Sequence, residues 1–149
     1  MSDFLSGYSI QRWLESCPQG YLEHTSFGHA PEVEEPAPGP GEIKIAVQAA
    51  AINPADVKWR SGMLRPFSEL VFPQVLGYDV AGTVCAIGDS ITGFDVGDRV
   101  VGMLDHRLKG GYAEFAVVSP QSCVKLPDTL DIALAAAIPT PGLTGIQLI

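Results

Sequence analysis

Apolar and polar residues alternate along residues 42–53, where Ile43, Ile45 and Val47 are separated by more polar neighbours. Successive side chains of a strand point to opposite faces of a sheet, so a period of two gathers the apolar ones on one face. The segment therefore predicts a strand with one buried face.

Four later segments also predict short strands, because β-branched and aromatic residues lie there between glycine and proline turns. These segments are residues 76–88, 93–102, 110–118 and 124–127. The chain has 16 glycines and 12 prolines, a number that favours short strands joined by turns over long helices.

A short helix is predicted within residues 54–65. Pro54 suits the first turn of a helix, and Gly62 ends the pattern after one or two turns. Asn53 stands directly before this segment and has the side chain of a good N-cap, which is one reading of its role.

The pattern changes after residue 128, where alanine and leucine predict a helix over 131–138. Asp128 or Thr129 is the candidate N-cap of this helix. The prolines from Pro139 on are expected to break it, and residues 142–149 predict the first turns of a second helix.

Three regions follow from the pattern. Residues 1–30 form an N-terminal extension with two weak edge strands at 11–15 and 20–24. Residues 31–128 open with a polar proline and glycine link and contain the predicted strands, whereas 129–149 form a helical tail. Strands followed by helices are typical of a small barrel that leads into another domain.

Composition and charge exclude several classes of partner. Hydrophobic residues make up 46% of the chain and charged residues 17%, as in a folded globular domain. The net charge is −8, and the scattered basic residues form no patch for nucleic acid, although an anionic cofactor needs only a few local cations. No apolar stretch approaches the roughly twenty residues that cross a bilayer, and no signal peptide pattern is present. We expect a cytoplasmic protein with no nucleic-acid or membrane partner.

Metal ligands are not grouped along the chain. His24, His29 and His106 have no cysteine or carboxylate at ligand spacing, and the three cysteines are far apart. A phosphate-binding glycine motif is also lacking. The residues by themselves predict a soluble all-β domain with a helical tail and no metal site.

A family resemblance adds to this picture through four blocks that occur in order. They are AAAINPADVKWRSG at 49–62, FPQVLGYDVAGTVCAIGDSITGFDVGDRVVG at 72–102, GGYAEFAVV at 110–118, and LAAAIPTPGLTGIQLI at 134–149. Over about residues 31–149 the chain resembles the zinc-independent medium-chain dehydrogenases/reductases of the quinone oxidoreductase and trans-enoyl reductase kind. The resemblance implies a mainly β fold: a GroES-like, partly open barrel of short strands with a few short helices and a helical C-terminal tail. In such reductases a Rossmann domain carries the glycine fingerprint for the cofactor, and that domain is missing from this sequence.

The resemblance also implies that zinc is absent. Zinc-dependent relatives have a cysteine before the short helix and a Gly-His-Glu after the next strand, and both hold catalytic zinc. Here those positions are Asn53 and Gly77-Tyr78-Asp79. Only the short loop 103–109 occupies the place of the lobe that holds structural zinc.

Three residues inherit roles from the resemblance. Asn53 is expected beside the nicotinamide and the substrate carbonyl, as a catalytic and cofactor-binding residue. Lys58 is expected to face a cofactor phosphate or a developing enolate, and its presence favours the enoyl reductase subgroup. Thr144 is expected to place a hydroxyl near the nicotinamide.

Plainer readings stand beside these roles. A solvated lysine is the plainer interpretation of Lys58, and Asp56 and Asp79 fit turn or barrel-packing roles as well as catalytic ones. We expect Asp98 to anchor a turn by accepting backbone hydrogen bonds, with Arg99 as its partner.

The resemblance implies the catalytic half of an NADPH-dependent oxidoreductase that reduces quinones or activated alkenes as its small-molecule substrates. Whether this chain is itself an enzyme stays open, because NADPH binding by one half is in doubt. One alternative is a stand-alone barrel that acts as a non-redox enzyme (an isomerase or cyclase) or as a ligand-binding module. Another is an interaction module, since an apolar surface over 135–149 would favour a homodimer or pairing with a nucleotide-binding domain.

Overall fold

The computed structural model describes residues 34–64, 66–67, 75–105 and 110–149. The chain divides into two compact units, of which the first comprises Met1–Glu34 and Val57–Glu69. The second comprises Glu35–Asp56 and Leu70–Ile149 and contains the five described strands. The predicted edge strands near the N-terminus and the three histidines lie outside the described residues.

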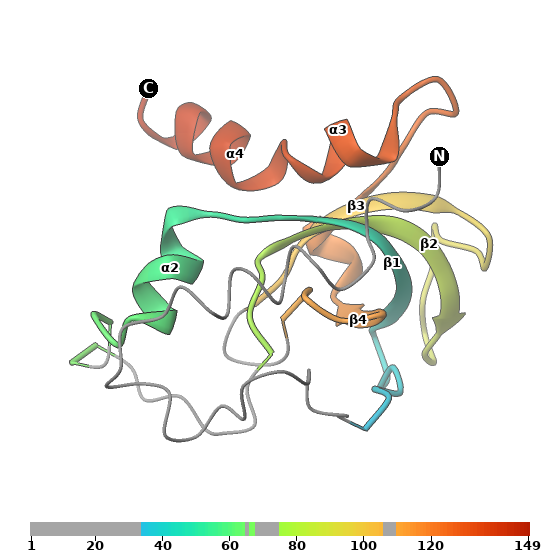
Figure 1. Ribbon diagram of the computed structural model, residues 1–149. Coiled ribbons are helices and arrows are strands. Elements are labelled where there is room, and N and C mark those ends of the chain that lie inside the picture. Colours follow the sequence, from blue (N-terminus) through green and yellow to red (C-terminus); the bar gives the residue numbers. More distant parts are fainter. Residues whose placement is uncertain (1–33, 65, 68–74, 106–109) are drawn as a thin grey trace, which may run out of the picture. The chain divides into compact units, whose positions relative to one another are not determined.

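The second unit is built on one sheet of five antiparallel strands in the order β4-β1-β2-β3-β5 (Figure 1). The strands are β1 (Ile43–Ala51), β2 (Asp79–Ile87), β3 (Arg99–Met103), β4 (Phe115–Val118) and β5 (Cys123–Lys125). A single 3₁₀ turn, η2 (Pro120–Ser122), leads into β5. The predicted mainly β fold is confirmed, and the described residues contain no second sheet.

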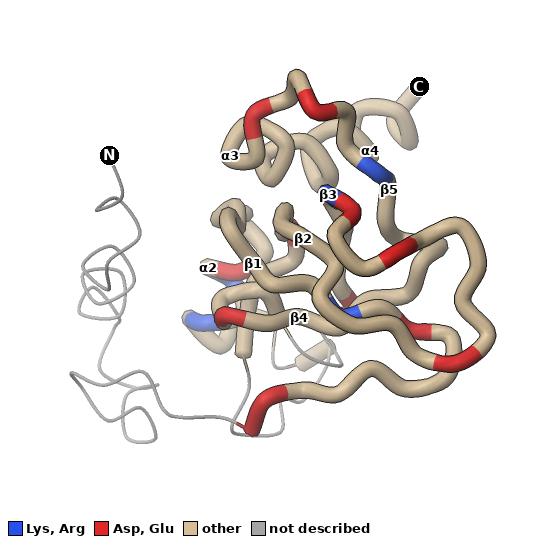
Figure 2. The backbone as a smooth tube through the Cα atoms, turned by 90° about the vertical axis from the view of Figure 1, so that its right-hand side faces the viewer, with Lys and Arg blue, Asp and Glu red and all other residues tan. Residues whose placement is uncertain are grey.

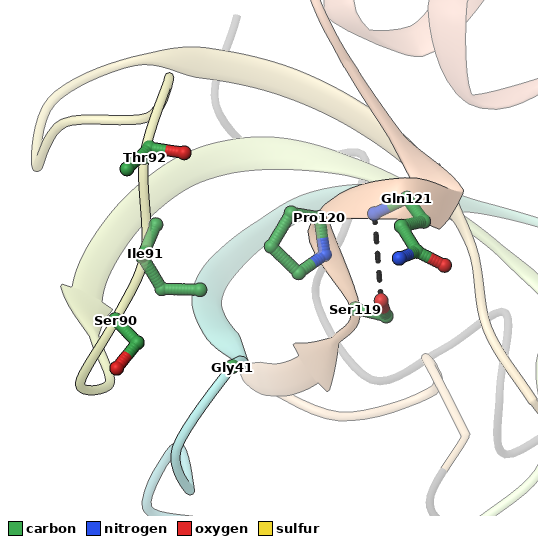
Figure 3. Close-up of a pocket in the computed structure, with 7 residues that line it drawn as sticks. All are labelled: Gly41, Ser90, Ile91, Thr92, Ser119, Pro120 and Gln121. Carbon is green, nitrogen blue, oxygen red and sulfur yellow. Dashed lines mark hydrogen bonds between the residues drawn. The ribbon is translucent and has the colours of Figure 1, made fainter.

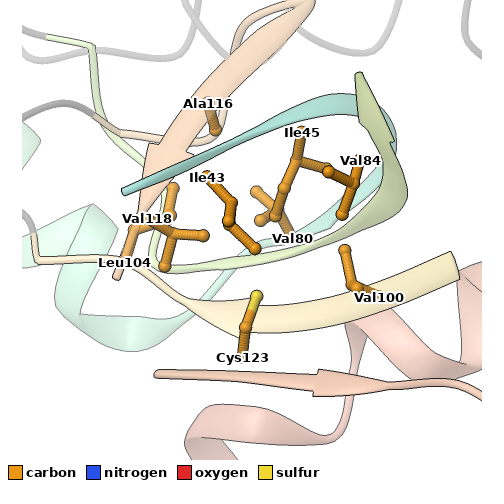
Figure 4. Close-up of a cluster of buried hydrophobic side chains, with 9 residues drawn as sticks. All are labelled: Ile43, Ile45, Val80, Val84, Val100, Leu104, Ala116, Val118 and Cys123. Carbon is orange, nitrogen blue, oxygen red and sulfur yellow. The ribbon is translucent and has the colours of Figure 1, made fainter. Parts of the chain in front are cut away.

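The sheet curls around an apolar core (Figure 4). Ile43 and Ile45 are fully buried in that core, as the alternation of β1 predicts, but the intervening Lys44 is buried as well, so burial does not alternate at the start of the strand. The pairing of β1 with β2 shifts at Lys44/Ile45 and again at Val47/Ala49. Such bulges bend a strand and increase its twist, which is how nine-residue strands close over a small core.

The described residues contain three helices, α2 (Pro54–Arg60), α3 (Ile132–Ala136) and α4 (Pro139–Gln147). The start of α2 at Pro54 is as predicted, although the helix ends before Gly62. The predicted N-cap of the tail helix is wrong, because Asp131 accepts from the backbone N–H groups of Ala133 and Leu134. An N-cap must stand directly before the first turn, and α3 begins later than the alanine pattern suggested.

The predicted break at Pro139 is confirmed, because α3 ends before it, but the start predicted for the second helix at residue 142 is wrong. Pro139 does not merely end the preceding helix but begins α4, where its missing N–H removes no hydrogen bond. The helix α3 lies across one face of the sheet, with Ala135 and Ala136 packed against Ala81 of β2. Small side chains on both elements allow the helix to lie close to the strands, so the tail up to α3 is anchored to the barrel (Figure 1).

The segment that precedes β4 also pairs with the residues that lead into β2. Predicted as strand from residue 110, it becomes strand only at Phe115. Its first residues instead pair with the approach to β2: the N–H groups of Gly110, Gly111 and Tyr112 donate to the carbonyls of Val75, Gly77 and Leu76, respectively. This pairing holds the entrance of β2 against the 110–112 loop.

Charged residues of the described part are dispersed along the chain (Figure 2). Asp98 accepts the backbone N–H of Asp95 at 2.7 Å, which confirms that it anchors a turn. The partner predicted for it is wrong: Lys125 contacts Asp98 at 2.6 Å, whereas Arg99 donates to the carbonyls of Pro127 and Leu130. In the described residues, no helix has the length and apolar character needed to cross a membrane.

Candidate functional site

Three polar side chains are buried where β1 ends, α2 begins and β2 begins. Asn53 is 6% exposed, and Asp56 and Asp79 are fully buried. Asn53 and Asp56 flank the first turn of α2, and Asp79 is the first residue of β2, directly paired with Ala51. Buried polar groups are expensive unless hydrogen-bonded, so their partners define what the cluster does.

Asp56 fixes the backbone around the start of α2. One of its oxygens, Oδ2, accepts the N–H of Asn53 at 2.8 Å, and Oδ1 accepts the N–H of Gly77 at 3.0 Å. The first contact is half of a capping box, in which a side chain in the first turn reaches back to the N-cap residue. Asp56 thereby ties the α2 turn to the segment before β2.

Tyr112 completes the surroundings of Asp56. Its hydroxyl hydrogen-bonds to the Asp56 carboxyl and also lies 3.2 Å from the carbonyl oxygen of Ala51. Burial raises the pKa of Asp56; the Asn53 N–H, the Tyr112 hydroxyl and the Gly77 N–H lower it, and the nearby Asp79 raises it further. Burial, and then the charge of Asp56, raise the pKa of Tyr112 far above its ordinary value, so the phenol stays neutral.

Asp79 receives three donors. Its Oδ2 accepts the side-chain Nδ2–H of Asn53 at 3.1 Å and the backbone N–H of Thr140 at 3.0 Å. Its Oδ1 accepts the Thr140 hydroxyl at 2.8 Å. The sequence reading of Asp79 as a turn or packing residue therefore understates its connections.

Thr144 is joined to the same group of residues. Its hydroxyl donates to the carbonyl oxygen of Thr140, one turn earlier in α4, at 2.7 Å, and its side chain is exposed. Two of the three predicted site residues, Asn53 and Thr144, thus belong to one chain of hydrogen bonds that passes through Asp79 and Thr140. Thr140 gave no signal in the sequence, whereas Asp79 could have been noticed as a charge in an otherwise apolar strand.

Asn53 occupies the N-cap position of α2, but its side chain does not cap that helix. The carboxamide turns to Asp79, and its remaining groups, Oδ1 and the second N–H of Nδ2, have no partner among the described residues. The side chain therefore keeps one acceptor and one donor for a ligand. Lys58 lies in the last turn of α2, is exposed, and belongs to the first compact unit, so its role stays a prediction.

The described cations of the second unit are already engaged. Lys44 pairs with Glu35 and lies over the Phe115 ring, while Lys125 pairs with Asp98. Arg99 holds two carbonyls, as described above. Within its described residues, this unit therefore has no unengaged cation for a phosphate.

No three His, Cys, Asp or Glu side chains gather closely enough to hold a metal ion in the described part of the chain. An open pocket of about 300 Å³ lies at the other end of β1, between the turns that contain Gly41, Ile91 and Pro120 (Figure 3). The other lining residues, Ser90, Thr92, Ser119 and Gln121, carry no titratable group, so the pocket is separate from the polar cluster in both place and chemistry.

Comparisons with known proteins agree with this fold. Residues 39–128 match the family model described as the alcohol dehydrogenase GroES-like domain. A chloroplast envelope quinone oxidoreductase homolog of Arabidopsis thaliana is 39% identical over 132 residues, which cover 85% of this chain and 40% of that protein. A trans-enoyl reductase of Aspergillus japonicus is 38% identical over 103 residues, which cover 66% of this chain and 29% of that protein.

A solved structure shows the same likeness. The quinone oxidoreductase of Pseudomonas syringae pv. Tomato DC3000 aligns with a TM-score of 0.70 and 36% identity, over 78% of this chain and 34% of that one. The chain thus spans about two fifths or less of the length of these proteins. The residues matched by the family model include Asn53, Asp56 and Asp79 and end before Thr140.

Proposed function

Because the chain belongs to the alcohol dehydrogenase GroES-like domain family, we propose that it forms the catalytic half of an NADPH-dependent oxidoreductase. The substrates proposed are quinones or alkenes activated by a carbonyl group, as the quinone oxidoreductase and enoyl reductase names of its relatives suggest. The whole activity of such a protein is a proposal for this chain, which covers only part of each relative.

The observation that carries the proposal is the Asn53 carboxamide. It is 6% exposed and anchored by one N–H to Asp79, while Oδ1 and the other N–H have no protein partner in the described residues. Buried amide groups rarely stay unpaired, so this pair of free groups favours a ligand that supplies both a donor and an acceptor. A ligand site that holds one carboxamide, which can donate a hydrogen bond, beside one carbonyl group, which can accept one, would satisfy both groups of Asn53.

A nicotinamide and a carbonyl substrate fit these two groups. NADPH, when bound, supplies the hydride for reduction of an electron-poor carbon. Asn53 Oδ1 would accept an N–H of the nicotinamide carboxamide, and the free Nδ2–H would donate to the substrate carbonyl oxygen. Negative charge grows on that oxygen during reduction, so a donor fixed in advance by Asp79 lowers the barrier.

Zinc-independent chemistry is part of the proposal. A carboxamide, Asn53, stands where the zinc-dependent members of the family have a cysteine thiolate, and Gly77-Tyr78-Asp79 replaces their Gly-His-Glu. A neutral amide is a poor ligand for zinc, which prefers thiolate and imidazole. In this proposal the Asn53 N–H, in place of a zinc ion, polarises the carbonyl group of the substrate.

Lys58 and Thr144 complete the proposed contacts with NADPH. The exposed Lys58 ammonium is assigned to a cofactor phosphate or to an enolate oxygen, and the Thr144 hydroxyl oxygen to the neighbourhood of the nicotinamide. Since the described cations of the second unit are engaged, we expect this chain to bind NADPH weakly, with the nicotinamide end making the specific contacts.

The test is titration of the purified chain with NADPH, followed by cofactor fluorescence, and then cofactor oxidation by a simple quinone or enone. We expect saturable binding that Asn53→Ala weakens at least tenfold. Gln121→Ala, which removes a carboxamide at the other end of β1, should bind as the unchanged chain does. Equal binding by both variants, or none by any, would contradict the proposal and leave the non-redox alternatives.

A second proposal concerns partners. The apolar side chains of Ile146 and Leu148 at the end of α4 are 73% and 82% exposed. Exposed apolar surface of this kind favours pairing, either with a nucleotide-binding domain or between two copies. Sedimentation equilibrium should show concentration-dependent dimers that Ile146→Lys abolishes, and a strictly monomeric chain would exclude the homodimer.

The cytoplasmic location predicted from the sequence is also kept as a proposal. The Arabidopsis relative is named as a chloroplast envelope homolog, which makes a plastid the competing compartment. Microscopy of the full protein with a C-terminal fluorescent tag distinguishes the two.

A further inference from the structure

We propose that Asp79 is a positioning residue that sets the orientation of the Asn53 carboxamide and the first turn of α4 together. Its importance for catalysis rests on the proposed function, because Asn53 and Thr144 are the proposed nicotinamide contacts. The coupling itself rests on hydrogen bonds and burial, and it can be tested without cofactor.

The carboxylate of Asp79 is shared between two distant segments. It is fully buried, and its donors are Asn53 from one side of the sequence and Thr140 from the other, 26 and 61 residues away. One oxygen, Oδ2, accepts from both segments at 3.1 and 3.0 Å. A rotation of the carboxylate that improves one contact therefore lengthens the other.

The start of α4 depends on this carboxylate. Its N-cap residue, Ile138, has no side chain that can accept a hydrogen bond, and the helix has no side-chain cap of its own. The Thr140 N–H lies in the first turn, where helical N–H groups lack intrahelical partners. Asp79, from the strand β2, supplies the missing acceptor, and its negative charge suits the positive end of the helix dipole.

Through these contacts, a movement of the first turn of α4 changes the hydrogen bonding of the Asn53 side chain. Two of the three donors to Asp79 come from Thr140, so displacement of the α4 turn leaves a buried carboxylate with the Asn53 N–H alone. A buried carboxylate with fewer donors must turn or gain water, and either change moves the Asn53 side chain. Thr144 moves with Thr140, since its hydroxyl is bonded to the Thr140 carbonyl one turn earlier.

The sequence allows a specific measurement, because Asn53 is the only asparagine in the chain. Selective ¹⁵N-asparagine labelling therefore gives one side-chain amide pair in a proton–nitrogen correlation spectrum. In the intact chain we expect the two N–H signals to differ, one being hydrogen-bonded to Asp79 and the other free. Their positions report the orientation of the carboxamide directly.

The decisive variant is Thr140→Val, which keeps the shape and the backbone N–H but removes the hydroxyl donor to Asp79. We expect it to shift the Asn53 side-chain signals and to speed hydrogen exchange of the bonded N–H at least threefold. Thr129→Val makes the same substitution at an exposed turn residue and should leave both readouts unchanged. A Thr140→Val spectrum with the Asn53 signals in place would overturn the proposal, because a merely structural Thr140 contact would destabilise α4 without moving them.

The reciprocal variant is Asp79→Asn, which offers a single acceptor oxygen. It should raise the exchange rate of the Thr140 N–H at least tenfold and shift the signal of the Asn53 N–H that is bonded to Asp79. If this variant does not fold, the Thr140→Val result decides alone. Coupling observed in a chain that does not bind NADPH would sustain the role of Asp79 and refute the proposed function, whereas binding without coupling would do the opposite.

Discussion

The two ends of β1 differ in what they bury. At the end that leads into α2, two carboxyls and a carboxamide are enclosed and held by named donors. At the other end an open pocket is lined by serine, threonine, proline and glycine from turns, with no charged side chain (Figure 3). The polar end is defined by its hydrogen bonds, whereas the residues that line the pocket carry no titratable group.

This difference shows why shape alone is a poor guide to function in this domain. Burial of Asp56 and Asp79 lowers stability unless every oxygen is satisfied, so such residues persist where geometry must be fixed. The pocket at the other end is formed by turns between strands, and it requires no burial of charged groups. Substitutions at the two ends should therefore have unequal effects.

The largest difference in stability is expected for Asp56→Ala against Ser119→Ala. Removal of the Asp56 carboxyl leaves the N–H groups of Asn53 and Gly77 buried without partners, which should cost about 3–5 kcal/mol in free energy of unfolding. Ser119→Ala removes one exposed 3.4 Å contact to Gln121 and should cost below about 1 kcal/mol. Urea denaturation of both variants makes the comparison, and equal losses would refute it.

A smaller effect is expected for Gly77→Ala against Gly93→Ala. Gly77 has φ +105°, and an added Cβ would lie 2.8 Å from the ring of Tyr112, so backbone strain and a clash add to about 2–4 kcal/mol. Gly93 has φ +84° with nothing within 4 Å of an added Cβ, so strain alone should cost about 1–2 kcal/mol. Thermal unfolding measures both. A loss at Gly93 as large as that at Gly77 would show that the Tyr112 contact is unimportant.

The smallest effect is a pH dependence of opposite sign at two aspartates. Burial raises the pKa of Asp56, so its contribution to stability is full below its ordinary pKa and is lost as pH rises through the raised value. The Lys125 hydrogen bond lowers the pKa of Asp98, so its contribution is present at neutral pH and is lost as pH falls. For the buried Asp56, a tenfold difference in proton affinity between the folded and unfolded chain corresponds to about 1.4 kcal/mol.

Denaturation between pH 3 and 7 checks these signs. The stability advantage of the unchanged chain over Asp56→Asn should be largest near the acid end, while its advantage over Asp98→Asn should be largest near neutrality. Parallel curves for the two variants would contradict the assignment of Asp56 as the aspartate destabilised by burial.

Local patterns in the sequence were sufficient to predict where the strands lie. Alternation identified β1, and glycine and proline turns placed β2, β3 and β5 within a few residues. The predictions failed where a tertiary partner decides. The partner of Asp98 is Lys125, on the strand that pairs with β3, and no local spacing indicates that contact.

The candidate site shows the same limit. Asn53 and Thr144 were predicted from family resemblance, and the structure joins them, but the residues that join them were not predicted. Thr140 contacts Asp79 only because α4 begins at Pro139 and approaches the start of β2. A sequence separation of 61 residues conceals that contact, whereas the carboxylate at the start of the apolar run of β2 was a signal that could have been used.

The most direct test of the account is an NADPH titration of the ¹⁵N-labelled chain, with the signals of individual residues followed. We predict that the side-chain amide of Asn53 and the backbone amide of Thr144 shift saturably, while the side-chain amide of Gln121 at the other end of β1 stays in place. Saturable shifts at Gln121 with Asn53 unmoved, or no shifts at any concentration, would contradict the claim that the buried polar end is the functional one.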